Sequence, residues 1–316
     1  MAGPTAPGAR HRGLPRLLAS VLLCLATVSA GCAATPDAPT AARPSSADPR
    51  PLTGQERQVL RTAEQVLTRR CMTAQGFRMW PTPPDPVPDA RDFPYVVDDP
   101  AWAARHGYGS DLQRRIEAVR AADPNRRYLR GLPPARRAAA LAALNGAVRE
   151  GPKVTLPDGT VLGRSRHGCT SAALRDLYGD LDAWFRVQTL TDNLSGTRQS
   201  RVFADPAYRD AIRQWSTCMN RRGHDYADPG ASRAAFADPR TPAQRAREIA
   251  TAVDEARCAR DSGLAATARR LDRHYDATLR TQYRTALQDR LRREHAALPR
   301  ARAVAPSPAR SPSTHS

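Results

Sequence analysis

Six cysteines carry the most distinctive chemistry in this chain, and four of them follow a repeated pattern. The phrase Cys-Met-x-x-x-Gly occurs twice, beginning at Cys71 and at Cys218. Each copy ends an amphipathic helical pattern and is followed much later by one more cysteine, Cys169 or Cys258. Thiols in such positions can form crosslinks, bind a metal or carry out redox chemistry, and their surroundings decide between these roles.

The other two cysteines lie in an N-terminal segment that has the pattern of an export signal. An apolar run, Leu17–Val28, follows three arginines, and no acidic residue occurs before Asp37. This run is too short to span a bilayer comfortably but suits the apolar region of a signal peptide. We therefore predict a signal peptide over residues 1–31, whose removal would take Cys24 with it.

Two processing sites fit the end of this segment. Ala30-Gly31-Cys32 resembles a lipobox, the bacterial motif whose cysteine is diacylated and becomes the mature N-terminus, although Ser29 stands where leucine is usual. Val28 and Ala30 instead suit a secretory cleavage before Gly31. Cys32 is therefore the predicted lipidation site, which would place the protein on the outer face of the membrane. A plainly secreted protein is the alternative.

Four cysteines remain in the mature chain, and an even number in an exported protein indicates disulfides. Four cysteines allow three pairings, and the repeat favours Cys71 with Cys169 and Cys218 with Cys258. On the chain-entropy model, closing loops of these lengths stabilises the folded state by about 4 to 5 kcal/mol each. Each pairing requires the two α-carbons to lie within about 7 Å.

Redox catalysis and zinc binding fit these cysteines less well. A thiol-disulfide oxidoreductase uses Cys-x-x-Cys at the start of a helix, where the helix dipole stabilises the thiolate. Here each Cys-Met cysteine stands near the end of a predicted helix with no second cysteine nearby. Four potential zinc ligands lack the spacing of a zinc finger or ribbon; they are His167, Cys169, Cys218 and His224.

The sequence lacks the common motifs of hydrolases. Neither Gly-x-Ser-x-Gly nor His-Glu-x-x-His occurs, and there is no glycine-rich phosphate loop. A glycosidase needs two carboxylates about 5 to 10 Å apart across a cleft. Glu56, Asp225 and Asp228 could supply such a pair, although helix caps and solvated acids are the commoner use of these residue types.

Proline-rich segments bound the chain that is predicted to fold. Residues 32–52 are small, polar and rich in proline, so they cannot bury enough apolar surface to fold. We predict a disordered tether here, long enough to hold a domain up to roughly 60 Å from a membrane. Residues 299–316 are rich in proline, serine and arginine and are predicted to form a disordered tail.

Between these ends, the pattern predicts an all-α domain of about seven helices with one small β-hairpin. Apolar residues recur at helical spacing, and only 5% of residues are aromatic, so alanine, leucine and valine must form the core. Pro157-Asp158-Gly159 supplies turn chemistry between two short apolar runs and predicts the hairpin. The repeat predicts two related, disulfide-linked lobes, 53–200 and 201–298, with the polar stretch 195–200 as their boundary.

Capping residues predict where the helices begin. Thr53 with Glu56, and Ser110 with Gln113, have the spacing of capping boxes. The longest helix is expected over residues 265–297. In the helix that contains Cys258, the cysteine should project on the side opposite the apolar positions, so this helix must contact neighbours on two sides. Other predicted starts are Asp180, Asp205 with Pro206, and Thr241 with Gln244.

Several of these features together resemble a family. Trp215 followed by the second Cys-Met phrase, the helix leading to Cys258, and Gly168-Cys169 before a later Leu-Tyr-Gly resemble uncharacterised exported lipoproteins of high-GC Gram-positive bacteria. The resemblance covers most of the chain from residue 53 to residue 264. It implies an exported, envelope-associated protein and supplies no catalytic or ligand-binding residue.

The formal net charge of +18 is the remaining indication of function. Removing the signal segment takes away only three arginines, so the mature chain stays strongly basic. Outside a Gram-positive cell, a basic surface would meet anionic lipid headgroups and wall polymers, while nucleic acid would be out of reach. Codon bias is the alternative source of the charge, because only Lys153 among the 49 basic residues is a lysine.

We therefore expect a non-catalytic protein of the cell envelope that binds an anionic wall component or assists another envelope protein. It should need no cofactor and no metal. A wall-polymer hydrolase with a carboxylate pair is one alternative, and a purely structural lipoprotein without a ligand is another.

Overall fold

The computed structural model describes residues 49–82, 87–148 and 150–305, and these ranges form helices and one small hairpin. Thirteen helices occur in this part of the chain, so the expected all-α class is confirmed and the expected number of about seven is too low. The helices are α1 Gly54–Ala74, α2 Pro100–His106, α3 Ser110–Ala122, α4 Pro124–Gly131, α5 Pro134–Asn145, α6 Cys169–Tyr178, α7 Leu181–Asp192, α8 Leu194–Ala204, α9 Pro206–Arg221, α10 Pro229–Ala234, α11 Pro242–Asp261, α12 Leu264–Gln282 and α13 Arg284–Val304.

Helices α1, α7, α9 and α11 begin where the capping residues predict. The Thr53 hydroxyl accepts a hydrogen bond from the Glu56 backbone N–H, and the Glu56 carboxylate accepts one from the Thr53 N–H. Thr241 and Gln244 form the same capping box at α11. The aspartates before α7 and α9 cap those helices as expected. These contacts satisfy N–H groups that a first helical turn leaves without partners.

Four helices were not predicted from the sequence, namely α2, α4, α8 and α10. Asp-Pro steps begin α2, α4 and α10, where the aspartate accepts a hydrogen bond from the first turn and the proline occupies the first helical positions. The polar stretch 195–200, expected to separate two lobes, lies inside α8. Leu194 and Val202 at either end of this stretch are buried, and their packing holds the stretch in a helix.

The predicted capping box at Ser110 is wrong. Gly109 precedes α3 with a left-handed backbone at φ 90°, and Ser110 is already helical. The Ser110 hydroxyl donates instead to the buried carboxylate of Glu248 at 2.7 Å. This partner comes from a distant part of the chain and overrides the local capping signal.

The long helix expected over 265–297 is two helices. α12 ends at Gln282 and α13 begins at Arg284, and Tyr283 between them has non-helical dihedral angles. The Tyr283 N–H still donates to the Leu279 carbonyl at 2.8 Å, and the Tyr283 carbonyl accepts from the Leu287 N–H at 3.0 Å. The two helices can therefore pack against different neighbours.

The predicted tail begins too early. Helix α13 continues to Val304 despite Pro299, and Ala301 is completely buried. The Arg300 guanidinium donates to the Leu177 carbonyl through Nε at 2.9 Å and through a terminal nitrogen at 2.6 Å. These contacts hold the last turns of α13 against α6 and outweigh the hydrogen bond that the proline forgoes.

The predicted tether also extends too far toward the domain. Leu52 is 5% exposed, and the Arg50 guanidinium forms two hydrogen bonds with Glu56 at 2.8 and 2.6 Å. His295 of α13 forms a hydrogen bond with the Arg50 carbonyl at 2.8 Å. The predicted signal peptide, most of the tether and Cys32 lie in residues 1–48, outside the described residues.

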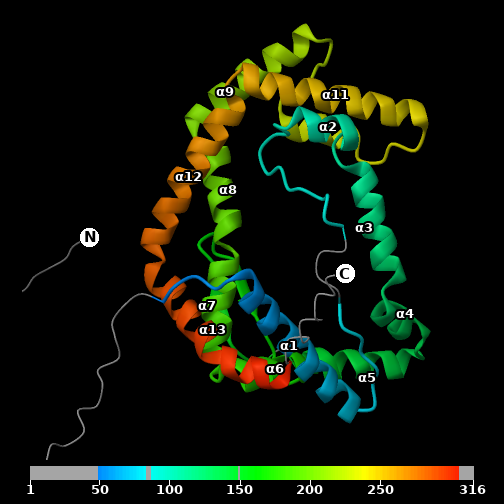
Figure 1. Ribbon diagram of the computed structural model, residues 1–316, viewed down its shortest axis with the longest axis vertical. Coiled ribbons are helices and arrows are strands. Elements are labelled where there is room, and N and C mark those ends of the chain that lie inside the picture. Colours follow the sequence, from blue (N-terminus) through cyan, green and yellow to red (C-terminus); the bar gives the residue numbers. More distant parts are fainter. Residues whose placement is uncertain (1–48, 83–86, 149, 306–316) are drawn as a thin grey trace, which may run out of the picture. The chain divides into compact units, whose positions relative to one another are not determined.

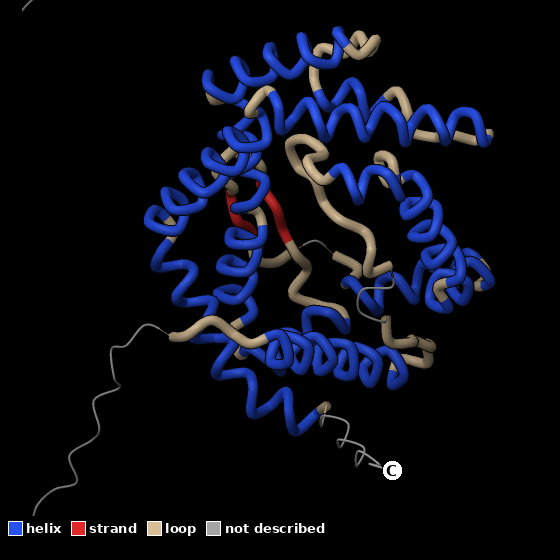
Figure 2. Tube along the Cα trace, turned by 45° about the horizontal axis from the view of Figure 1, so that its top comes forward, coloured by secondary structure: helices blue, strands red, loops and turns tan. Residues whose placement is uncertain are grey.

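The hairpin is present as predicted (red in Figure 2). Strands β1, Lys153–Thr155, and β2, Val161–Gly163, are antiparallel, and Val154 lies opposite Leu162. Gly159 takes φ 85° in the turn, which a residue with a side chain rarely adopts, and its N–H donates to the Leu156 carbonyl at 2.9 Å.

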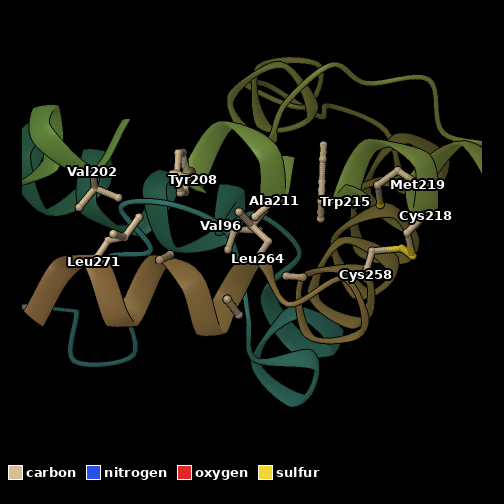
Figure 3. Close-up of a cluster of buried hydrophobic side chains, with 13 residues drawn as sticks. Val96, Val202, Tyr208, Ala211, Trp215, Cys218, Met219, Cys258, Leu264 and Leu271 are labelled. Atoms are coloured by element: carbon tan, nitrogen blue, oxygen red, sulfur yellow. A yellow bond between two sulfur atoms is a disulfide. The ribbon is translucent and has the colours of Figure 1, made fainter. Parts of the chain in front are cut away.

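A hydrophobic cluster surrounds the second disulfide (Figure 3). Trp215, Met219 and Tyr208 of α9 pack with Leu264 and Leu271 of α12 and with the Cys218–Cys258 bridge. Helix α11 contacts α2 as well as α9 and α12, which confirms that the helix of Cys258 has neighbours on two sides. Figure 1 shows α2 lying beside α11.

A second cluster joins the two ends of the described chain. Helix α13 packs against α1 and α6, and Leu60, Leu177, Trp184 and Leu298 share this core. Figure 1 shows α1 in blue near α13 in red. Like the contact of α2 with α11, this core combines residues from both sides of residue 200.

Candidate functional site

Both disulfides favoured by the repeat are present. Cys71 of α1 is bonded to Cys169 of α6 with α-carbons 5.4 Å apart, and Cys218 of α9 to Cys258 of α11 with α-carbons 5.7 Å apart. Both distances lie below the limit of about 7 Å for an unstrained bridge. Lipidation of Cys32 stays a prediction, because that residue lies outside the described ranges.

The four potential zinc ligands do not come together as a thiolate site. Cys169 and Cys218 belong to different disulfides, so neither offers a thiolate. His224 instead lies with its Nε2 3.1 Å from the Asp254 carboxylate, and His167 is exposed in the loop before α6. Across the described ranges, no group of three or more histidines, cysteines or acids is arranged to hold a metal ion.

Two of the three acids weighed as a hydrolase pair serve as helix caps. Glu56 completes the capping box of α1, and its hydrogen bonds from Arg50 and from the Thr53 backbone lower its carboxyl pKa to about 2. Asp228 caps α10 by accepting from the Ala231 N–H at 2.9 Å. Asp225 is exposed in the preceding loop. Glu56 and Asp228 are thus accounted for by local structure.

Two acids that sequence reasoning missed are completely buried. Glu248 and Glu255 are each 0% exposed, one above the other on the same face of α11. Ala252 and Ala256 lie on the same face, and both are buried. The two acids are seven residues apart, on a helix face that also carries alanines, and this spacing could have indicated that they share a buried face. Acids usually lie on solvated faces, so the pattern predicted exposure instead.

Glu248 holds the start of α3 against α11. One carboxylate oxygen accepts from the Tyr108 and Ser110 backbone N–H groups at 2.8 and 3.3 Å. The other accepts from the Ser110 hydroxyl and the Arg245 guanidinium, both at 2.7 Å. Gly107 must be glycine here, because its φ is +57° and an added β-carbon would lie 2.7 Å from the Glu248 carboxylate.

Glu255 joins the loop before α2 to α11. It accepts from the Val97 N–H at 3.1 Å and from the Tyr108 hydroxyl at 2.7 Å, and that hydroxyl also contacts Ser232. Burial raises the pKa of the Glu255 carboxyl, and the hydrogen bonds from Tyr108 and Val97 oppose that rise. With all four oxygens of Glu248 and Glu255 bonded inside the protein, these acids act as structural links between chain segments.

The most distinctive surface feature is a set of arginines without acids. Residues 65–82 and 124–148 contain eight arginines and no aspartate or glutamate. Seven of the eight side chains are exposed, and none forms an ion pair with a described acid. We call this set the arginine surface; it comprises Arg69, Arg70, Arg78, Arg126, Arg127, Arg130, Arg136 and Arg137.

Direct contacts bring these two segments together beside the first disulfide. The Arg136 guanidinium lies 4.4 Å from the centre of the Phe77 ring and donates to the Gly76 carbonyl at 2.9 Å. The Trp80 backbone exchanges two hydrogen bonds with the Asn125 side chain, at 2.9 and 3.0 Å. The Trp80 and Tyr128 rings meet edge to face with centres 5.7 Å apart. The two basic segments therefore form one region.

Several arginines outside this set form ion pairs with acids. Arg245 pairs with Glu248 at 2.7 Å, and Arg290 pairs with Glu294 at 3.0 Å. Arg222 pairs with Asp254 at 2.9 Å. In contrast, the Arg126 and Arg127 side chains are exposed and form no hydrogen bond or ion pair with the described residues. Positive charge thus stays available on the arginine surface.

Comparisons with protein-family models, with curated proteins and with solved structures gave no significant match. Among the described residues, no helix is both long and apolar enough to span a lipid bilayer.

Proposed function

We propose that this protein is exported, anchored through Cys32 to the outer face of the cell membrane, and has a non-catalytic role in the cell envelope. Through the arginine surface it binds an anionic, phosphate-bearing component of the envelope. The observation that carries this proposal is the meeting of two arginine-rich, acid-free segments beside the Cys71–Cys169 bridge.

The physical support is an unneutralised positive field. Guanidinium groups bind phosphate oxygens with paired, charge-assisted hydrogen bonds. Each arginine near an anionic membrane surface contributes about 1 kcal/mol of attraction. Salt should weaken this binding strongly, because the screening length falls from about 10 Å at 0.1 M to about 3 Å at 1 M.

The non-catalytic part of the proposal is supported by how the acids are used. Glu56 and Asp228 cap helices, and Glu248 and Glu255 hold buried backbone groups. A hydrolase that works through a carboxylate pair needs both acids to face a cleft. Each of these four acids is already engaged within the fold.

A charge-reversal experiment tests the proposed binding. Arg70, Arg126 and Arg127 are changed together to glutamate; all three are exposed, and their side chains form no hydrogen bond or ion pair with the described residues. The control changes Arg221, Arg247 and Arg284 to glutamate, which are equally exposed and unpaired but lie on α9, α11 and α13. Both variants lose the same charge, so only its position differs. Binding is measured to soluble polyphosphate and to phosphatidylglycerol vesicles.

We expect the first variant to bind roughly 10- to 100-fold more weakly and the control to bind nearly as well as wild type. Binding to polyphosphate would indicate a wall polymer as the natural component, and binding to vesicles alone would indicate the membrane. Equal loss in both variants, or no binding by wild type to either probe at low salt, would refute the proposal. The anchor is tested separately by the mass of the mature N-terminus; an unmodified start at Gly31 would refute it.

A further inference from the structure

A concave site lies between the end of α5, strand β2 and α7, and none of its described lining residues belongs to the arginine surface. It has a volume of about 610 Å³. Leu141, Ala142, Ala147 and Phe185 supply the apolar part of its lining, polar atoms supply the larger part, and no acid is among its described lining residues. Arg164 supplies the one charged side chain of the described lining.

Arg164 is partly buried and lacks the partners that such an arginine normally has. Its Nε is inaccessible to solvent and has no hydrogen-bond partner among the described residues. The guanidinium lies 5.8 Å from the centre of the Phe185 ring, and no described acid forms an ion pair with it. Arg290, which is similarly shielded, pairs with both Glu294 and Asp192.

The surrounding backbone fixes this arginine in place. Its N–H donates to the Pro152 carbonyl at 3.1 Å, directly after the hairpin. The neighbouring Ser165 is buried and approaches Gly146 so closely that an added β-carbon there would lie 2.2 Å from the serine oxygen. Gly146 also has φ +87°, so this wall of the site requires glycine. The site is therefore formed before any ligand arrives.

An unpaired charge in such a position carries an energetic cost. Burial lowers the pKa of Arg164, and the nearby Glu64 carboxylate opposes this shift without forming an ion pair. Glu64 is instead hydrogen-bonded by the Tyr178 hydroxyl at 2.6 Å, and burial raises its own pKa. Proteins usually pair such charges, because a desolvated guanidinium without an acceptor is unfavourable. The terminal nitrogens of Arg164 also have no hydrogen-bond partner among the described residues and are not enclosed as Nε is, so an external anion would supply the acceptor that they lack.

We propose that Arg164 binds the anionic group of a small organic ligand, a phosphate or carboxylate carried on an apolar or aromatic body that packs against Phe185 and the alanines of α5. This site stands independently of the proposed function, because none of its described lining residues belongs to the arginine surface. The planar guanidinium suits both anionic groups, and the apolar lining suits the body to which the group is attached.

Calorimetric titration with phenyl phosphate, benzoate and inorganic phosphate tests this site. Arg164→Gln removes the charge, and Arg186→Gln on α7 is the matched control, because Arg186 is exposed and without a partner among the described residues. Ala147→Phe fills the site from an exposed position and leaves Arg164 unchanged. Circular dichroism checks that each variant is folded.

We expect wild type and Arg186→Gln to bind an aromatic anion more tightly than inorganic phosphate, and Arg164→Gln to lose at least about tenfold in affinity. The preferred aromatic ligand shows whether phosphate or carboxylate suits the site. If Arg164→Gln does not fold, loss of binding in Ala147→Phe carries the test. Absence of wild-type binding to all three probes at millimolar concentration, or unchanged binding in both site variants, would overturn the proposal. Charge reversal on the arginine surface should leave this binding intact.

Discussion

At the scale of single residues, the most informative side chains are the two carboxylates inside the fold. Glu248 and Glu255 receive donors from segments more than a hundred positions earlier in the chain. Removing a donor or acceptor from such a network leaves its partner buried and unsatisfied. We therefore expect these two acids to stabilise the folded state although neither is exposed to solvent.

Glu255 gives a prediction about pH. Burial raises its pKa above the ordinary value of 4.5, so the native state holds this proton more tightly than the unfolded chain does. Its contribution to stability is therefore fully present below pH 4.5 and is lost as pH rises through the raised pKa. Glu255→Gln should flatten this fall in the free energy of unfolding, measured by urea denaturation at a series of pH values.

Glu255→Ala separates charge from hydrogen bonding. It removes the acceptor of the Val97 N–H, which should cost about 1 to 3 kcal/mol at every pH. Glutamine keeps an acceptor for that group, so it should be the more stable variant near neutral pH. A glutamine variant with the same pH slope as wild type would show that Glu255 does not titrate differently in the two states.

Sequence predicts what depends on near neighbours in the chain. The Thr53–Glu56 and Thr241–Gln244 capping boxes are predicted correctly because each is complete within four residues. The Ser110 box fails because that hydroxyl is taken by Glu248, a partner that only the folded chain brings near. For the arginine surface, the sequence predicted only an excess of positive charge. The grouping of these arginines depends on how α4 and α5 pack against the end of α1, which the sequence does not reveal.

At the scale of helices, the face of α11 that packs against α2 differs from the face that the apolar residues predict. The apolar positions of α11 are Ile249, Val253 and Ala256, yet only Ala256 is completely buried, while Ile249 and Val253 are partly buried. The completely buried positions of α11 are Glu248, Ala252, Glu255, Ala256, Cys258 and Ala259. Small residues let α2 approach closely, and a scale of side-chain hydrophobicity gives such positions little weight.

Helix α13 gives a prediction at this scale. Ala301 is 0% exposed in the core shared with α1 and α6, whereas Ala303 on the same helix is exposed. Ala301→Asp would bury an unpaired charge and should lower the free energy of unfolding by about 3 kcal/mol or more. Ala303→Asp adds the same charge to the same helix and should have little effect. Thermal denaturation compares the two; equal melting temperatures would mean that α13 is not held against the core.

At the scale of the whole molecule, the two bridges differ in their accessibility. Cys71 is partly exposed, while Cys169, Cys218 and Cys258 are all buried. Each bridge links helices within one of the predicted lobes, yet the cores of α1 with α13 and of α2 with α11 cross residue 200. The lobes thus depend on each other through packing rather than through a covalent link.

This difference predicts the order of reduction. A thiolate must reach a sulfur atom to open a bridge, so a mild reductant should open Cys71–Cys169 before Cys218–Cys258. Alkylation followed by mass spectrometry would identify the free cysteines at each time point. Loss of the first bridge should lower stability by about 4 to 5 kcal/mol on the chain-entropy model. Earlier labelling of Cys218 and Cys258 would contradict the prediction.

The fastening of Arg50 and Leu52 to α13 has a mechanical consequence. His295 bonds to the Arg50 carbonyl, and Leu52 is buried in the core that Leu298 and Ala301 share. Tension applied from the N-terminal side would reach this junction before the rest of α1. Such tension must first remove Leu52 from the hydrophobic core. This junction therefore protects α1 from being unfolded from its N-terminal end.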